Sequence, residues 1–526
     1  HGKQRANTMR KITLLLILAL ALSLASSTAA QEQEIGLAPN DKLLAWVGPG
    51  SVPGQQRPDA PGQVVYILPD GTLEPVLKLQ PQTARVQPCG STEATSPDGE
   101  HFAFFVGINA GGVRDRGTLY LINGTDANAQ PVENELYGVT CIGAGLFEFS
   151  QDSTRLAYMD YPDGYNVARS PSARLFIKDT STLETIAEYD NVAAFKMSET
   201  GAVFVSFFYN NEDEAVEVAF STWDGVRDRE IAALRAEENN DCRYISASIT
   251  DLPDGRMAAV LGYQCRIGVT SSQWQLYIID PATRSATQLR SAVAPGAYFP
   301  FSGTNRIFAS PDGTQLYFTL PDGISNRTVA LNTIQTTGET TLRQIILQYA
   351  IMPTLSIAPY DAGNHAPVLS QDGRWLALVR NTPDNDASLI VLDLAAPQLP
   401  PITIPARSRG DTIGEMLFLP DSTRLYFVSG ANRAGDNSLF ELDLATGSDF
   451  RVDRGRFEQG VLSPDAAQTA LMNWQIVDDD EPAFLNLTAL NLTTGLQATL
   501  FEGAAVINED VTDQRFVYPL SWRRSR

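Results

Sequence analysis

One short pattern recurs along the chain and limits what it can fold into. A small or apolar residue, often Ser, is followed by Pro or Gln, then Asp, then Gly or a small polar residue, and then an alternating apolar strand. The clearest copies are Ser96-Pro97-Asp98-Gly99, Ser310-Pro311-Asp312-Gly313 and Ser370-Gln371-Asp372-Gly373. Weaker copies are centred on Asp152, on Asp254 with Gly255, on Asp421 and on Asp465, and degenerate copies occupy 38–41, 198–201 and 511–514.

The pattern has the chemistry of a tight turn. Pro presets φ at the first central position, Asp bonds the backbone ahead of it, and Gly takes the positive φ that reverses the chain. Each copy therefore marks a hairpin between two strands. Successive Asp-equivalent positions are 44 to 60 residues apart, a period that is typical of propeller blades rather than of small solenoid turns.

A second pair of strands follows each hairpin. Its first strand is apolar and tends to end in Asp or Asn, as at 118–123, 173–179, 274–280, 388–394 and 438–444, and a more variable strand leads to the next repeat. Two hairpins make a four-stranded antiparallel sheet, whose apolar faces can be buried only against neighbouring sheets.

We therefore predict an all-β chain that forms a single closed β-propeller of four-stranded antiparallel blades. Ten turn signals are present, and signals from the two ends of the chain can share one blade. We favour eight blades, with seven and nine open, and we expect the ring to close where 503–520 meets the strands at 43–48 and 63–68.

The repeat resembles the WD-like propeller repeats of the TolB family. In that family a Ser-Pro-Asp-Gly turn precedes an Ile/Leu-Ala-Tyr/Phe strand, and a Leu-Tyr-hydrophobic-Asp strand follows. The resemblance covers nearly all of residues 36–520, without the α/β domain that precedes the blades in TolB itself and with more blades. It implies a propeller that acts in the cell envelope.

The first thirty residues predict export rather than fold. A basic start at Met9-Arg10-Lys11 precedes an apolar run at 12–24 and small residues that end at Ala30, which is the order of a secretory signal peptide. We assign 1–30 to upstream residues and this signal, and 31–526 to the propeller. The exported chain is then secreted or periplasmic, with no transmembrane segment after signal removal. An uncleaved signal anchor is the alternative.

Charge bears on the partners that the protein can take. The formal net charge is −22, and loss of the signal region removes four basic residues and no acid, which brings it to −26. Such a surface repels phosphate backbones and anionic headgroups. We therefore expect protein or extracellular polymer partners and no nucleic acid.

Four cysteines in an exported chain predict two disulfides. Cys242 and Cys265 lie twelve residues before and eleven after Asp254, so they face each other across one hairpin. Cys89 and Cys141 occupy similar places before the hairpins of adjacent blades. We pair Cys242 with Cys265 and Cys89 with Cys141; a metal site is the alternative, which the absence of CxxC spacing disfavours.

Chemistry-bearing motifs are sparse. Only His101 and His365 remain after signal removal, and His365 precedes a strand that should line the central channel, although a structural role is the simpler interpretation. No GxSxG motif occurs, which argues against a propeller-bearing serine peptidase. Acidic runs at 210–214, 384–388 and 478–481 could bind Ca²⁺, but none matches a full calcium loop, and we otherwise expect no cofactor.

Two classes of function follow. The first is a noncatalytic binding module of the cell envelope or extracellular space, which uses one propeller face or the channel mouth. The second is an enzyme acting on extracellular polysaccharide through carboxylates in the channel, and an Asp or Glu with a raised pKa there would distinguish it. A structural role such as a surface layer comes third. We expect no catalytic residues.

Overall fold

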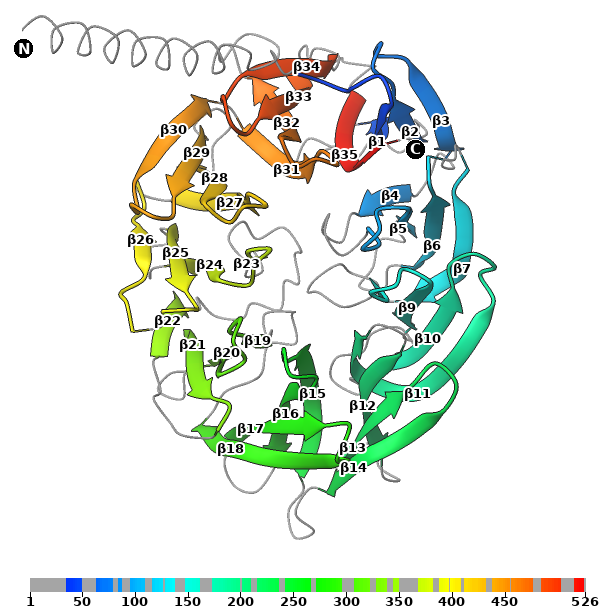
Figure 1. The fold of residues 1–526 in the computed structure, drawn as a ribbon, viewed down its shortest axis with the longest axis vertical. Helices are drawn as coiled ribbons and strands as arrows, with labels where there is room; N and C mark the ends of the chain where they lie inside the picture. The colour runs from blue at the N-terminus through cyan, green and yellow to red at the C-terminus, as the bar shows by residue number, and fades with distance from the viewer. Residues whose placement is uncertain are drawn as a thin grey trace, which may run out of the picture.

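The computed structural model describes most of the predicted strands and many of the turns between them. The described residues are 35–49, 63–78, 84–87, 95–108, 116–125, 128–137, 147–160, 173–198, 201–209, 215–235, 242–265, 271–295, 307–321, 328–337, 344–349, 368–381, 387–396, 398–407, 411–431, 438–454, 456–475, 484–502 and 515–524. Within these ranges the regular elements are all β-strands, and Figure 1 shows them arranged as a ring of small sheets.

The strands group into blades of four that are antiparallel and consecutive, apart from the last strand of the chain, which joins the first blade. Two pairs of neighbouring blades are continuous: blades 3 and 4 share a strand, and one parallel pair, Gln348 with Asn381, joins blade 6 to blade 7. Blade 1 is β35 (Arg515–Arg524), β1 (Asp41–Pro49), β2 (Gln63–Ile67) and β3 (Leu73–Lys78); blade 2 is β4 (Ala84–Gln87), β5 (His101–Ile108), β6 (Arg116–Asn123) and β7 (Gln130–Tyr137). Blade 3 is β8 (Phe147–Phe149), β9 (Arg155–Asp160), β10 (Ala173–Asp179) and β11 (Thr185–Met197).

The following blades repeat the arrangement. Blade 4 is β11, β12 (Ala202–Tyr209), β13 (Ala215–Trp223) and β14 (Asp228–Arg235); blade 5 is β15 (Cys242–Asp251), β16 (Met257–Cys265), β17 (Ser271–Asp280) and β18 (Ser285–Pro295). Blade 6 is β19 (Ile307–Ala309), β20 (Gln315–Pro321), β21 (Thr328–Gln335) and β22 (Gln344–Tyr349).

The last three blades complete the series. Blade 7 is β23 (Val368–Leu369), β24 (Trp375–Asn381), β25 (Ala387–Asp393) and β26 (Ile402–Ile404); blade 8 is β27 (Asp411–Phe418), β28 (Arg424–Ala431), β29 (Ser438–Asp443) and β30 (Asp449–Arg454). Blade 9 is β31 (Arg456–Leu462), β32 (Gln468–Gln475), β33 (Phe484–Asn491) and β34 (Gln497–Glu502). In Figure 1 strands such as β4, β23 and β31 lie toward the centre, and β3, β18 and β30 lie on the outside.

One strand serves two blades. The first half of β11 pairs with β10 between Thr185 and Val192, and its second half pairs with β12 between Val192 and Met197. This strand is 13 residues long, about twice the common strand length. Blades 3 and 4 therefore form one seven-stranded sheet.

Alternation along each strand explains why the blades pack face to face. In β1, Leu44 and Trp46 lie in an apolar cluster with blade 2, whereas Leu43 and Ala45 lie in another with blade 9. Successive side chains of a strand point to opposite faces, so both faces of one blade are buried against different neighbours. Within the described residues, apolar clusters join each blade to the next, and one of them joins blade 9 to blade 1.

These observations confirm the all-β class and the four-stranded antiparallel blades. The described strands form nine blades, where the sequence favoured eight and left nine open. The difference comes from the chain ends. The turn at 38–41 precedes β1, the expected last signal at 511–514 lies outside the described residues just before β35, and β1 and β35 belong to the same blade. Ten signals with one shared blade make nine.

We predict that replacing a phenylalanine buried between two blades lowers the free energy of unfolding far more than replacing one on the rim. Phe427 is fully buried between blades 7 and 8 and stacks on Phe440 with ring centroids 5.4 Å apart, whereas Phe450 of the same blade is 55% exposed. Phe427→Ala should lower the free energy of unfolding by about 3–5 kcal/mol, because it leaves a cavity. Phe450→Ala should change it by about 0.5 kcal/mol or less. Chemical denaturation of both variants checks this, and equal losses would contradict it.

We also predict a disulfide across one hairpin of blade 5. The register of β15 and β16 sets Cys242 directly opposite Cys265. Opposed residues in antiparallel strands have Cα atoms about 4.5–5.5 Å apart, which lies within the range that disulfides span. Peptide mapping without reduction should recover a fragment in which these two cysteines are linked. Two free thiols, or a link from either cysteine to Cys89 or Cys141, would refute the pairing. Cys89 and Cys141 lie outside the described residues.

Candidate functional site

The recurring turn is built by a serine and an aspartate that bond each other and the backbone. In blade 6, the Ser310 hydroxyl donates to Asp312 Oδ1 at 2.5 Å and accepts from the backbone N–H of Gln315 at 2.9 Å. Asp312 Oδ1 also accepts from the N–H of Thr314 at 3.0 Å. The N–H of Gly313 donates to the Ser310 carbonyl at 2.8 Å. The turn therefore satisfies its own polar groups between two buried strands.

The same geometry recurs around the ring. In five blades the serine hydroxyl donates to the aspartate two residues later over 2.5–2.7 Å, at Ser96, Ser150, Ser310, Ser370 and Ser463. Leu252 and Leu419 replace the serine in two other blades, where Asp254 and Asp421 still accept from the backbone two residues ahead. The glycine position has positive φ at Gly99, Gly255, Gly313 and Gly373, and Ser153, Ser422 and Ala466 adopt that conformation without being glycine.

Neighbouring turns touch each other. Gly313 of blade 6 lies on Pro253 of blade 5, so close that an added Cβ would come within 3.0 Å of the proline ring. In blade 3, where Ser153 replaces glycine, its hydroxyl accepts from the backbone N–H of Asp98 in blade 2 at 3.1 Å. At these two positions the fourth residue of the turn thus contacts the turn of the preceding blade, whereas a Cβ added at Gly99 or Gly255 would meet no atom within 4 Å.

Hydrogen bonds within the turns lower the pKa of several turn carboxyl groups. For Asp312, the hydrogen bond from the Ser310 hydroxyl is the main reason that its pKa lies below the ordinary value, and the Thr314 N–H adds to it. Lowered pKa values recur at Asp70, Asp98, Asp152, Asp179, Asp224, Asp254, Asp280, Asp372, Asp443 and Asp465. Such carboxylates are acceptors for turns and are poor proton donors.

We predict a pH signature for this turn. Because the pKa of Asp312 is lower in the folded chain, its charge stabilises the fold above the unfolded pKa of about 3.9, and that stability is lost as pH falls through the folded pKa. Asp312→Asn should therefore cost about 0.5–1.5 kcal/mol at pH 7 and much less near pH 2.5. Thermal unfolding at both values measures it.

The control for that experiment removes a charge without removing a turn. Asp228→Asn, on the exposed edge strand β14, takes away one carboxylate of the same type. Its stability difference from the wild type should stay small at both pH values. If Asp312→Asn shows a deficit that does not shrink in acid, the carboxylate charge is not what stabilises the turn.

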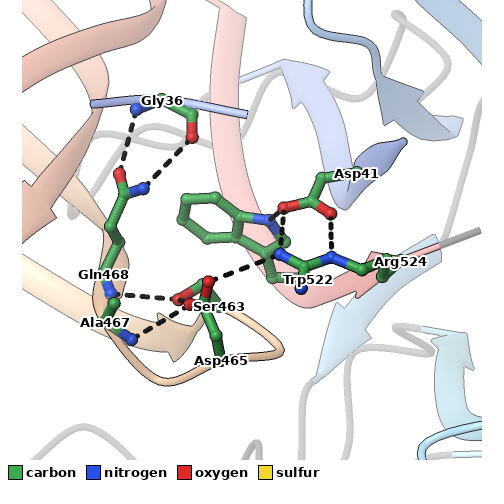
Figure 2. A network of polar contacts seen from close by, with 8 residues as sticks. All are labelled: Gly36, Asp41, Ser463, Asp465, Ala467, Gln468, Trp522 and Arg524. Atoms are coloured by element: carbon green, nitrogen blue, oxygen red, sulfur yellow. Dashed lines mark hydrogen bonds and ion pairs between the residues drawn. The ribbon is translucent and has the colours of Figure 1, made fainter. Parts of the chain in front are cut away.

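A denser polar network joins the two ends of the described chain (Figure 2). Arg524 Nε donates to Asp41 Oδ1 at 2.7 Å, and its Nη2 donates to Asp41 Oδ2 at 3.3 Å and to Asp465 Oδ2 at 3.4 Å. Trp522 Nε1 donates to Asp41 Oδ2 at 3.1 Å. Asp41 is only 2% exposed, so these donors take the place of the water that would otherwise bond its side chain. The cluster ties β35 to β1 and to the turn of blade 9.

Two further contacts extend this junction. The Gly36 N–H donates to Gln468 Oε1 at 2.9 Å, and Gln468 Nε2 donates back to the Gly36 carbonyl at 3.4 Å, which fixes the segment before β1 to blade 9. On the opposite side, buried Arg523 donates through Nη2 to the backbone carbonyls of Gly99 and Glu100 in blade 2. Consecutive arginines of β35 therefore reach the blades on both sides of blade 1.

We predict that the arginine at the end of β35 contributes strongly to stability. Arg524→Ala should lower the free energy of unfolding by about 2–4 kcal/mol, because it leaves a buried carboxylate without its cation. Arg524→Lys should recover part of the loss, since an ammonium keeps the charge but not the two-pronged geometry. Arg235→Ala, which breaks an ion pair with Glu217 on the exposed rim, should cost at most about 1 kcal/mol. Similar losses for Arg524→Ala and Arg235→Ala would contradict this prediction.

Buried tyrosines form a second group of polar contacts between blades. Tyr158 donates to Glu133 Oε2 at 3.0 Å, and Lys178 Nζ donates to the Val132 carbonyl at 2.7 Å. Tyr426 donates to Glu441 Oε2 at 2.5 Å and to the Leu492 carbonyl of blade 9 at 3.0 Å. Burial, followed by the neighbouring glutamate, raises the pKa of both phenols well above the ordinary range. They stay neutral and act as donors that link blades.

The candidate chemistry-bearing residues fall in different places. His101 Nδ1 lies 2.8 Å from Asn123 Oδ1, and its ring stacks near Phe149, so it belongs to the blade 2 turn. His365 and the acidic runs at 210–214 and 478–481 lie outside the described residues, as does most of the run at 384–388. In the described part of the chain, no group of three or more His, Cys, Asp or Glu is arranged to hold a metal ion. The described ranges also contain no helix that is long and apolar enough to span a membrane.

Sequence reasoning missed the residues that link the blades. The Trp522-Arg523-Arg524 run lies just beyond the closing segment expected at 503–520. The sequence does contain a signal for these contacts. The run places three large side chains in a row at the end of a strand, and side chains of a strand alternate between its two faces, so they reach the two neighbouring blades in turn. The linking tyrosines also have a signal, since Tyr317 and Tyr426 both come five residues after a turn aspartate and each donates to a carbonyl of the next blade.

Comparison with known proteins found no match in sequence and only distant similarity among solved structures. No family model matches the chain, and no curated protein matches it in sequence. Similar solved structures include a eukaryotic initiation factor (TM-score 0.45, 14% identity, 91% of this chain and 99% of that chain). Others are the dipeptidyl peptidase 4 of Porphyromonas gingivalis (0.48, 12%, 79% and 60%) and the periplasmic gluconolactonase of Pseudomonas aeruginosa (0.37, 14%, 80% and 99%). The last two are β-propeller proteins, and similarity at this level assigns no activity.

Proposed function

We propose that this chain is a closed, TolB-like β-propeller that acts outside the cytoplasm as a noncatalytic binding module for a protein or polymer partner. The observation that carries the proposal is where the described polar side chains make their hydrogen bonds. The described turn carboxylates and buried tyrosines bond the backbone and neighbouring blades, so their role is to hold a rigid scaffold. A rigid ring that presents loops is a common way to bind large partners.

Closure is supported by two contacts at the junction. The register between β1 and β35 runs from Asp41 opposite Arg524 to Pro49 opposite Arg515. The apolar cluster that contains Leu43 and Trp522 also contains Val461 and Ala470 of blade 9. A ring joined in this way exposes few sheet edges and keeps a fixed shape under the conditions outside a cell.

The polysaccharide-active alternative gains no support from the described residues. A glycoside hydrolase needs one carboxylic acid that stays protonated near neutral pH. The pKa of each described carboxyl group with a clear shift is lowered, including Asp98 and Asp465, where burial opposes the hydrogen bonds that lower it. These residues are suited to accept hydrogen bonds and not to protonate a leaving group.

Partner capture tests the proposal. The mature chain, immobilised as bait, should retain a defined protein or polymer from the envelope of the producing cell, and the retained partner should bind saturably when purified. The Phe427→Ala variant is the matched bait, because loosened packing between blades 7 and 8 should weaken binding without changing the surface charge. Turnover of any member of a glycan panel by the wild type, or failure to retain any partner, would overturn the noncatalytic binding role.

Export has its own test. Expression with the native leader should release a protein whose first residue is Gln31, as cleavage after Ala30 requires. Mass spectrometry of the extracytoplasmic fraction measures it. Retention of the intact leader in the membrane fraction would instead favour the signal anchor.

A further inference from the structure

The C-terminal strand is held as a separate ligand would be. Its nine register pairs with β1 are all between residues more than 460 positions apart in sequence. Its neighbours in space are strands of blades 1 and 9 and the turn of blade 2, which are all formed by other parts of the chain. β35 therefore adds to the edge of β1 in the same way that an extended peptide adds to an exposed sheet edge.

The contacts around β35 select a particular sequence. Trp522 is buried in the cluster with blade 9 while its indole N–H donates to Asp41. Arg523 reaches backbone carbonyls of blade 2, and Arg524 reaches carboxylates of β1 and of the blade 9 turn. An aromatic residue followed by two cations fits this surface, because carbonyls lie on one side and carboxylates on the other.

Removing β35 from the edge of β1 leaves several polar groups without their hydrogen-bond partners. Without β35, β1 loses the ladder along one edge, and the buried Asp41 carboxylate loses three of its hydrogen bonds. Asp465 loses the guanidinium contact but keeps the bonds from Ser463 and Ala467. The free energy lost at this edge favours any strand that restores the same contacts.

We propose that the edge of β1, with Asp41, Asp465 and the Gly99 carbonyl around it, is a strand-binding site for an extended segment ending in Trp-Arg-Arg. Its resident occupant is β35, and the C-terminal strand of a second copy of this chain occupies it when its own is displaced. This site is independent of the partner proposed above, because its ligand is a segment of the chain itself. Exchange between copies produces a dimer with two complete blades of the blade 1 type.

The test uses the full chain, folded first and cut afterwards. One protease recognition sequence is inserted between residues 503 and 514, and the folded protein is cut there and mixed with a fluorescent peptide of residues 515–526. The labelled peptide should co-elute with the protein and be displaced by unlabelled peptide. A peptide carrying Arg524→Ala should compete at least tenfold less well than the wild type. A peptide carrying Arg515→Ala, which removes the same charge at the other end of the strand, should compete nearly as well as the wild type.

A second cut site controls for damage to the ring. The same insertion between 476 and 483, which joins β32 and β33, should give no uptake of the peptide. The proposal is overturned if the protein cut between 503 and 514 unfolds, if it stays folded and takes up no peptide, or if the two variant peptides compete equally.

Exchange between whole chains has a separate readout. When the uncut protein is refolded at high concentration, a fraction should form dimers, and added peptide 515–526 should reduce that fraction. The Arg524→Ala peptide should reduce it at least tenfold less effectively. A dimer population that is insensitive to the wild-type peptide would rule out exchange through this site.

Discussion

The burial of two faces at once governs this structure. A four-stranded sheet with apolar residues on both faces cannot be stable alone, because one neighbour covers only one face. Leu44 and Leu43, adjacent in β1, lie in the clusters shared with blade 2 and blade 9 respectively. Each blade therefore needs two neighbours, and the arrangement that gives every blade two neighbours is a ring.

The turns solve the problem that this packing creates. Strands buried on both faces must reverse direction without leaving polar backbone groups unpaired, and the Ser-x-Asp turn bonds those groups within six residues. Contact between the turns of adjacent blades, as between Gly313 and Pro253, then couples local geometry to the spacing of the ring. At blade 1, where Ala38 stands in place of the serine in the turn at 38–41, Arg523 and Arg524 supply the contacts to both neighbours.

Turn chemistry and alternation made the fold predictable from the sequence, because both are local. Asp98, Asp312 and Asp372 stand in short patterns whose geometry depends on five or six residues, and the opposed positions of Cys242 and Cys265 follow from counting outward from one such turn. The blade count and the junction were harder, since they depend on which distant strands meet. Asp41 and Arg524 are 483 positions apart, and no local sequence pattern around either residue predicts that the two will pair.

The strand shared by blades 3 and 4 bears on how such a ring can change over evolutionary time. Propellers gain or lose blades when a segment of the gene is duplicated or deleted, and the breakpoints are harmless where they fall in connections between sheets. Between blades 3 and 4 no such connection exists, because β11 passes from one to the other within a single extended run. A breakpoint there would divide a strand that pairs with both blades, so adding or removing one of these blades alone would disrupt the other.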